Sequence, residues 1–162
     1  MARIIAICNQ KGGIGKTTTA VSLATGLARF GKKTLLIDTD AQCNSTDTYR
    51  AVTKDTATLY DLLLENEDLE ECIQHTHSGD IIASDKLLTS AEQKFPQDPS
   101  RYFLMKQKCQ ALEDMYDYII IDTPPVLGVI LSNVLTYANE CIIPFTCDRY
   151  AIKRCIILLF IR

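Results

Sequence analysis

The 162-residue sequence lacks several features that would place it in a specialised class of protein. Its longest apolar run, residues 155–161, falls far short of the roughly 18–20 residues that a membrane-spanning helix needs. The seven cysteines form no C-x-x-C pair and are odd in number, so we expect reduced thiols that behave as small hydrophobes, without zinc or disulfides. A formal net charge of -3 excludes a strongly basic nucleic-acid binder, so any DNA contact must come from a local patch.

The first residues run directly into the apolar stretch 4–8, without the charged leader and cleavage site of a signal peptide. We therefore expect a cytoplasmic protein. The length and the lack of internal repeats or linkers predict one domain over residues 1–162. His75-Thr-His77 has no third ligand nearby in sequence, and we interpret it as an exposed turn.

Short runs rich in Ile or Leu, without polar alternation, indicate buried parallel strands. They lie at residues 4–8, 34–37, 118–121 and 141–143, with a shorter one at 81–83. Helical spacing or composition predicts helices at residues 17–30, 58–65 and 102–115, and an apolar helix at 151–161. Polar or proline-containing stretches predict loops at 41–56 and 95–100. Alternating strands and helices predict an α/β domain with a mostly parallel sheet.

The sequence Lys-Gly-Gly-Ile-Gly-Lys-Thr-Thr spans residues 11–18, between a predicted strand and a predicted helix. Its glycines allow a tight turn whose N–H groups point at phosphate oxygens, and the helix N-terminus adds positive charge. Lys16 can reach the β- and γ-phosphates, and the Thr17 hydroxyl suits Mg²⁺. We expect the whole loop to bind ATP: Lys11, Gly12, Gly13, Ile14, Gly15, Lys16, Thr17 and Thr18.

Acidic residues follow two of the predicted strands. Asp38 and Asp40 end the stretch 35–42, and Asp122 ends the apolar run 118–121 before Thr-Pro-Pro. The carboxyl ends of parallel strands line the ligand crevice, so these carboxylates should face the phosphate loop. Asp122 would bind Mg²⁺, mostly through water. Acidic residues at strand ends also cap loops or helices, which stays an alternative for Asp38.

The octapeptide at 11–18 resembles the deviant Walker A loop of the ParA/MinD/Soj ATPases. The resemblance implies a three-layer P-loop NTPase fold and a lysine, here Lys11, that reaches the partner subunit's ATP in a sandwich dimer. Residues 38–42 resemble the family's switch I motif, with Ala41 in place of the usual proline. That match implies that Asp40 orients or deprotonates the attacking water and that Asp38 helps to hold Mg²⁺. Lys11, Lys16 and Asp40 are thus the expected catalytic residues, and Thr17, Asp38 and Asp122 the metal-binding ones.

The resemblance also covers residues 57–64, 79–85 and 142–145, and it implies that the family's C-terminal strands and helices lie beyond Arg162. It implies a Mg²⁺-dependent ATPase of plasmid or chromosome partitioning, with an ATP-dependent homodimer, non-specific DNA binding and a ParB-type activator. The protein would associate with the nucleoid if DNA binding is retained. One alternative is a truncated module that binds nucleotide or oligomerises without turnover. Another is a MinD-type membrane switch, although residues 151–162 have only three basic residues and are mostly apolar, so we expect no membrane contact.

Overall fold

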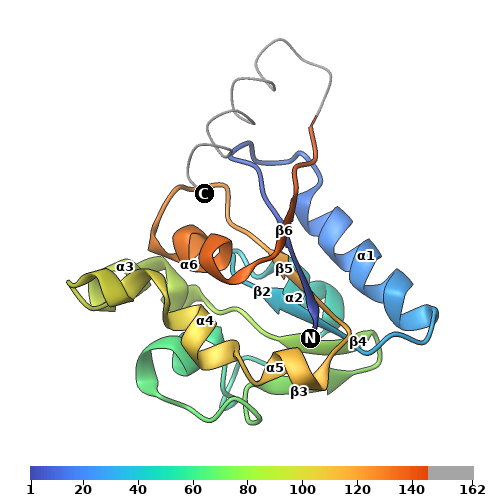
Figure 1. Cartoon of the computed structure of the whole chain (residues 1–162), viewed down its shortest axis with the longest axis horizontal. Coiled ribbons are helices and arrows are strands. Elements are labelled where there is room, and N and C mark those ends of the chain that lie inside the picture. The colour runs from blue at the N-terminus through green and yellow to red at the C-terminus, as the bar shows by residue number, and fades with distance from the viewer. Residues whose placement is uncertain (146–162) are drawn as a thin grey trace.

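The computed structural model describes residues 1–145, apart from the side chain of Glu92. Its centre is a six-stranded sheet in the order β3-β4-β2-β5-β1-β6 (Figure 1). The strands are β1 Arg3–Ile7, β2 Thr34–Asp38, β3 Ile73–Thr76, β4 Gly79–Ile82, β5 Tyr118–Asp122 and β6 Glu140–Ile142. Among the described strands only β3 runs antiparallel to its neighbour. The predicted mostly parallel sheet is confirmed.

Helices cover both faces of the sheet and complete three layers (Figure 1). The α-helices are α1 Lys16–Arg29, α2 Asn44–Tyr49, α3 Ala91–Lys94, α4 Leu104–Cys109, α5 Leu112–Met115 and α6 Val129–Tyr137. The shorter turns are the π-helical η1 Asp61–Glu65 and the 3-10 helices η2 Lys86–Ser90 and η3 Pro99–Tyr102. Helices α1 and α2 pack on one face, and α4, α6 and η1 pack on the other. This arrangement confirms the three-layer α/β fold.

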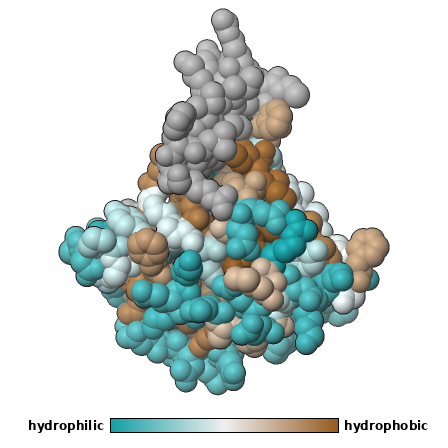
Figure 2. Space-filling model, in the orientation of Figure 1, coloured by the Kyte–Doolittle hydropathy of each residue, from teal (hydrophilic) through white to brown (hydrophobic). Residues whose placement is uncertain are grey.

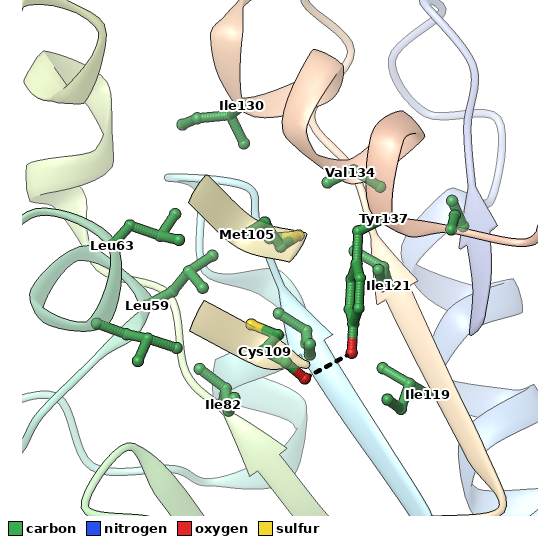
Figure 3. Packing of buried hydrophobic residues seen from close by; sticks show 14 of the residues in the cluster. Leu59, Leu63, Ile82, Met105, Cys109, Ile119, Ile121, Ile130, Val134 and Tyr137 are labelled. Atoms are coloured by element: carbon green, nitrogen blue, oxygen red, sulfur yellow. Dashed lines mark hydrogen bonds between the residues drawn. The ribbon is translucent and has the colours of Figure 1, made fainter. Parts of the chain in front are cut away.

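Burial on both faces explains why the strands read as continuous apolar runs. All five residues of β2 are buried, and Leu36 contacts a different core from its neighbours Leu35 and Ile37. The larger core lies between the sheet and α4 with α6, where Met105 and Val134 face strand β5 (Figure 3). A strand with a polar face would leave one of these two cores incomplete.

The helix predicted at 102–115 is divided in the structure. Asp98 caps η3 by accepting a hydrogen bond from the Ser100 amide, and α4 and α5 follow as separate short helices. The Tyr137 hydroxyl donates to the Cys109 carbonyl at 2.9 Å (Figure 3). Because this carbonyl bonds to a side chain from α6, the backbone ladder is interrupted where α4 ends.

Three further predictions need correction. Residues 41–56 are not a continuous loop, because they contain α2; residues 61–65 are a π-turn within the helix predicted at 58–65. His75 lies on β3, so only His77 belongs to a turn. Strand β3 and helix α6 were not predicted from the sequence. The part of the chain that the structure describes contains no group of three or more possible metal-ligating residues.

The five described cysteines are free thiols, and three of them are buried, as predicted. No helix within residues 1–145 is long and apolar enough to cross a membrane. Cys147, Cys155, the basic residues 149, 153 and 154 and the helix predicted at 151–161 lie outside the described residues.

Candidate nucleotide-binding site

The register of the central strands brings the predicted site residues to one edge of the sheet. Asp122 pairs with Ile7 on β1 and with Asp38 on β2. The glycine-rich loop follows β1 directly, so it leaves the sheet beside both carboxylates. Ligands of open α/β sheets bind at this carboxyl edge.

Two glycines of the loop have conformations that other residues rarely adopt. Gly13 has φ 67° and Gly15 has φ 90°, both in the left-handed region. A Cβ atom added at Gly12 would meet no atom of the described chain within 4 Å, so its outer side is open to a ligand. The loop then enters α1, whose first turn has no side-chain cap and no acidic residue. Exposed N–H groups and the positive end of the helix dipole therefore suit an anion here.

A hollow of about 500 Å³ lies over this loop. Its lining combines glycines, a lysine, hydroxyls and one carboxylate: Gly12, Gly13, Gly15, Lys16, Thr17, Thr18, Asp40, Gln42, Asn44 and Pro125. Most of the predicted phosphate-binding residues thus meet in one place. Lys11, Ile14, Asp38 and Asp122 are not among the described residues that line it.

Lys16 is the cation at the centre of the site. Its side chain is largely buried, and its Nζ lies 3.4 Å from the Lys11 carbonyl, to which it donates. Burial lowers the pKa of Lys16, while the charges of Asp122 and Asp40 oppose this shift. A partly desolvated ammonium group next to the loop N–H groups attracts a polyphosphate more strongly than an exposed one would.

Asp122 has one satisfied and one unsatisfied carboxylate oxygen. Its Oδ2 accepts a 2.7 Å hydrogen bond from Ser45, and its buried Oδ1 has no hydrogen-bond partner within residues 1–145. Burial raises its pKa, and nearby Ser45 and Thr17 lower it. An unsatisfied carboxylate oxygen close to a threonine hydroxyl provides the hard oxygen ligands that Mg²⁺ prefers. The residues present therefore fit a magnesium ion.

Asp38 is fully buried and uses both oxygens inside the protein. Oδ1 accepts from the Asp40 amide at 3.0 Å, and Oδ2 accepts from the Thr46 amide and hydroxyl at 2.9 and 2.8 Å. Burial raises the pKa of Asp38 to about 6, although these hydrogen bonds act in the opposite direction. The metal-binding role of Asp38 stays a prediction, and its contacts favour a positioning role for the following loop.

Asp40 is held at the rim of the hollow by its neighbours. Its Oδ1 accepts from the Gln42 amide at 3.0 Å, and its carbonyl accepts from the Ser84 hydroxyl at 2.8 Å. One carboxylate oxygen is thus used to shape the turn. The predicted role of Asp40 toward the attacking water stays a prediction.

Several residues of the site were not found from the sequence. Ser45 and Thr46 lie on α2, which has a polar sequence without helical periodicity, and they bind Asp122 and Asp38. Asn9 accepts from the Lys11 amide and donates to the Pro144 carbonyl, so it ties the loop to the chain beyond β6. The only available signal was a row of hydroxyl and amide side chains next to the acidic motifs.

Lys11 is half-buried at the front of the loop, and its amide and carbonyl take part in the loop hydrogen bonds. Its predicted role needs a second copy of the protein and stays a prediction.

Comparisons with known proteins agree with this geometry. Residues 2–160 match a family described as an AAA domain. The sporulation initiation inhibitor protein Soj of Bacillus subtilis is 40% identical over 156 residues, which cover 94% of this chain and 62% of Soj. The chain thus spans less than two thirds of that relative.

Two solved structures are also similar to this chain. A plasmid partition protein from Borrelia burgdorferi superposes with a TM-score of 0.91 at 33% identity, covering 99% of this chain and 73% of the other. A cobyrinic acid a,c-diamide synthase from Mycobacterium smegmatis, with bound ADP and magnesium, gives 0.92 at 30% identity over 99% and 66% of the two chains. The chain therefore belongs to the AAA domain family, within the ParA/MinD/Soj group of P-loop ATPases.

Proposed function

We propose that this chain binds Mg²⁺-ATP in the hollow over residues 11–18 and hydrolyses it as a ParA-type partitioning ATPase. The observation that carries the proposal is the meeting of Lys16, Thr17 and Asp122 beside two glycines with positive φ. Family membership and the ADP and magnesium of the mycobacterial neighbour support it.

Each residue has a defined task in this proposal. The loop amides and Lys16 hold the phosphates, and Thr17 and Asp122 hold Mg²⁺, which would neutralise charge that develops on the phosphate oxygens. Asp40 has a carboxylate at the rim, where it is suited to orient a water molecule toward the terminal phosphate. Asp38 holds the backbone of Asp40 in place through its amide.

The proposal extends to a reaction cycle. ATP would bring two copies together face to face, with Lys11 of each reaching the partner's nucleotide. The dimer would bind DNA non-specifically, and a ParB-type protein would stimulate hydrolysis. The name of the plasmid partition protein supports a role in partitioning, which would place the protein with the DNA in the cytoplasm.

The test is to measure Mg²⁺-ATP binding, phosphate release and molar mass for the 162-residue chain and three variants. We expect Lys16→Ala to lose nucleotide binding, because it removes the buried cation of the loop. We expect Lys11→Ala to keep binding and to lose the ATP-dependent dimer. Lys106→Ala, an exposed lysine on α4, is the matched control and should behave as the parent. Unchanged binding and turnover in Lys16→Ala would show that the site is assigned wrongly.

A second candidate is a nucleotide-binding or oligomerisation module without turnover. It is favoured by Ile142 and Phe145, which are exposed at the end of β6, on the edge of the described sheet. Hydrophobic side chains gather on this upper part of the surface, whereas the lower part is mainly hydrophilic (Figure 2). An oligomer that forms without nucleotide and shows no phosphate release would support the module.

A further inference from the structure

Two adjoining hollows lie around the turn between β3 and β4, at the end of the sheet opposite the phosphate loop. One has a volume of about 470 Å³ and lies between this turn and the end of α2. The other, of about 460 Å³, lies between the turn and the end of α1. They share Thr76, His77 and Ser78, and neither shares a lining residue with the hollow over the phosphate loop.

An arginine lines each of the two hollows, in a chain whose formal net charge is -3. Arg50 and His75 line the first hollow, Arg29 lines the second, and His77 lines both. No aspartate or glutamate is among the described residues that line either one. The two arginines and the two histidines therefore come from three segments that are distant in sequence, and they line adjoining hollows.

The two arginines are available to a ligand. Arg29 and Arg50 are exposed, and neither side chain takes part in an ion pair or hydrogen bond with any other residue in 1–145. Asp47 precedes Arg50 by three residues on α2, and only the Arg50 backbone contacts it, through the Asp47 carbonyl. His75 differs, because its Nδ1 lies 2.7 Å from Asp80. The arginines thus supply the main uncompensated charge.

The walls of these hollows are fixed by buried contacts. Tyr49 is 3% exposed, its hydroxyl lies 3.4 Å from the Thr25 hydroxyl, and a Cβ at Gly79 would lie 3.6 Å from its ring. The Gln74 side chain bonds both the amide and the carbonyl of Val52, at 2.8 and 2.7 Å. These contacts join α1, α2 and the β3–β4 hairpin, so the walls of the hollows need little ordering when a ligand binds.

We propose that this surface, formed by Arg29, Arg50, His75 and His77, binds the phosphodiester backbone of DNA. Guanidinium groups match phosphate oxygens well, and hydroxyls of Thr48 and Ser78 in the lining add neutral donors. Two joined hollows, each with its own arginine, suit neighbouring phosphates of a polyanion better than one small anion. The inference rests on the proposed function only for the choice of DNA as the polyanion.

The test is fluorescence anisotropy with a labelled 20-base-pair duplex, titrated with the full chain at several KCl concentrations. Each phosphate contact contributes about 0.9 to the slope of log K against log salt. We expect the double variant Arg29→Ala/Arg50→Ala to bind more weakly and to reduce this slope by about 2. Lys86→Ala/Lys106→Ala removes the same charge from exposed positions elsewhere and should keep the slope.

The outcomes separate this inference from the proposed function, because Mg²⁺-ATP binding is measured on the same samples. A reduced slope in the arginine variant alone, with ATP binding retained, supports the surface. Equal slopes in the two double variants, or no binding of the duplex by the parent chain, would overturn it. Inorganic phosphate at matched ionic strength should not displace the duplex, and displacement would identify a small-anion site in its place.

Discussion

Replacing Thr46 with valine would remove one hydroxyl from the hydrogen bonds that hold α2 behind the phosphate loop. This hydroxyl donates to Asp38 Oδ2 at 2.8 Å and accepts from the Ser84 amide at 2.9 Å. All three residues are at most 1% exposed. Valine has nearly the shape of threonine, so the change tests the hydrogen bonds with little change in packing.

The expected cost follows from these two contacts. A hydrogen bond to a charged group contributes about 1.5–3 kcal/mol, and a buried amide left without a partner costs about 1–3 kcal/mol. Because one hydroxyl serves both contacts, we expect a loss of about 3 kcal/mol in the free energy of unfolding at pH 7.5. For a protein of this size that corresponds to a decrease in Tm of roughly 6–12 °C.

Part of this loss should depend on pH. The Thr46 hydroxyl lowers the pKa of Asp38, so its removal raises that pKa further above the parent value of about 6. Near pH 5 Asp38 is protonated in both proteins, and the deficit should shrink to the part that comes from the Ser84 amide.

The assay is urea unfolding at pH 7.5 and pH 5 without nucleotide. Thr48→Val is the matched control, since Thr48 is exposed on the same helix and, within residues 1–145, its hydroxyl bonds only to the Asn44 carbonyl. We expect this control to lose less than about 0.5 kcal/mol in the free energy of unfolding. If Thr46→Val were no less stable than Thr48→Val at pH 7.5, the reasoning about α2 would be refuted.

Three further predictions concern the same edge of the sheet. Gly15→Ala should lower the free energy of unfolding by about 1–2 kcal/mol, because Gly15 has a φ of 90°. Gly12→Ala should leave the stability in urea unchanged and weaken Mg²⁺-ATP binding at least about tenfold in a titration, because its Cβ would point into the open space over the loop. Asp122→Asn should remove the magnesium-dependent part of the thermal shift by ATP, and an unchanged shift would argue against its metal role. Burial raises the pKa of Asp38 from 3.8 to about 6, so its contribution to stability should fall as pH rises through that interval, by up to about 3 kcal/mol. Asp38→Asn should lack this pH-dependent step when unfolding is followed from pH 4 to pH 7.

The features that could be predicted from the sequence are those encoded by neighbouring residues. The apolar runs gave four strands to within one or two residues at each end. Three of them, β1, β2 and β5, are almost wholly buried and therefore mostly apolar, whereas β6 lies at the edge of the described sheet. The glycines at 13 and 15 and the lysine at 16 indicated a phosphate loop, since few other local structures need that combination. The acidic residues Asp40 and Asp122 were found because they follow strands.

The features that could not be predicted depend on partners distant in the chain. Helix α2 has a polar sequence and is held by Ser45 on Asp122, 77 residues away, and by Thr46, which also accepts from the amide of Ser84. The helix at 102–115 is interrupted because the Tyr137 hydroxyl binds the Cys109 carbonyl. Neither contact leaves a periodic pattern in the sequence.

The sequence alone therefore determined the α/β fold with a mostly parallel sheet and the nucleotide loop, since both arise from local apolar patterning and from backbone conformations that only glycine tolerates easily. The tertiary structure decided which oxygen of Asp122 stays available and that Asp38 is used within the protein. It also decided that Arg29 and Arg50 line adjoining hollows around the β3–β4 turn. Burial and hydrogen bonding between distant segments set these properties, and they exist only once the sheet and its two helical layers are assembled.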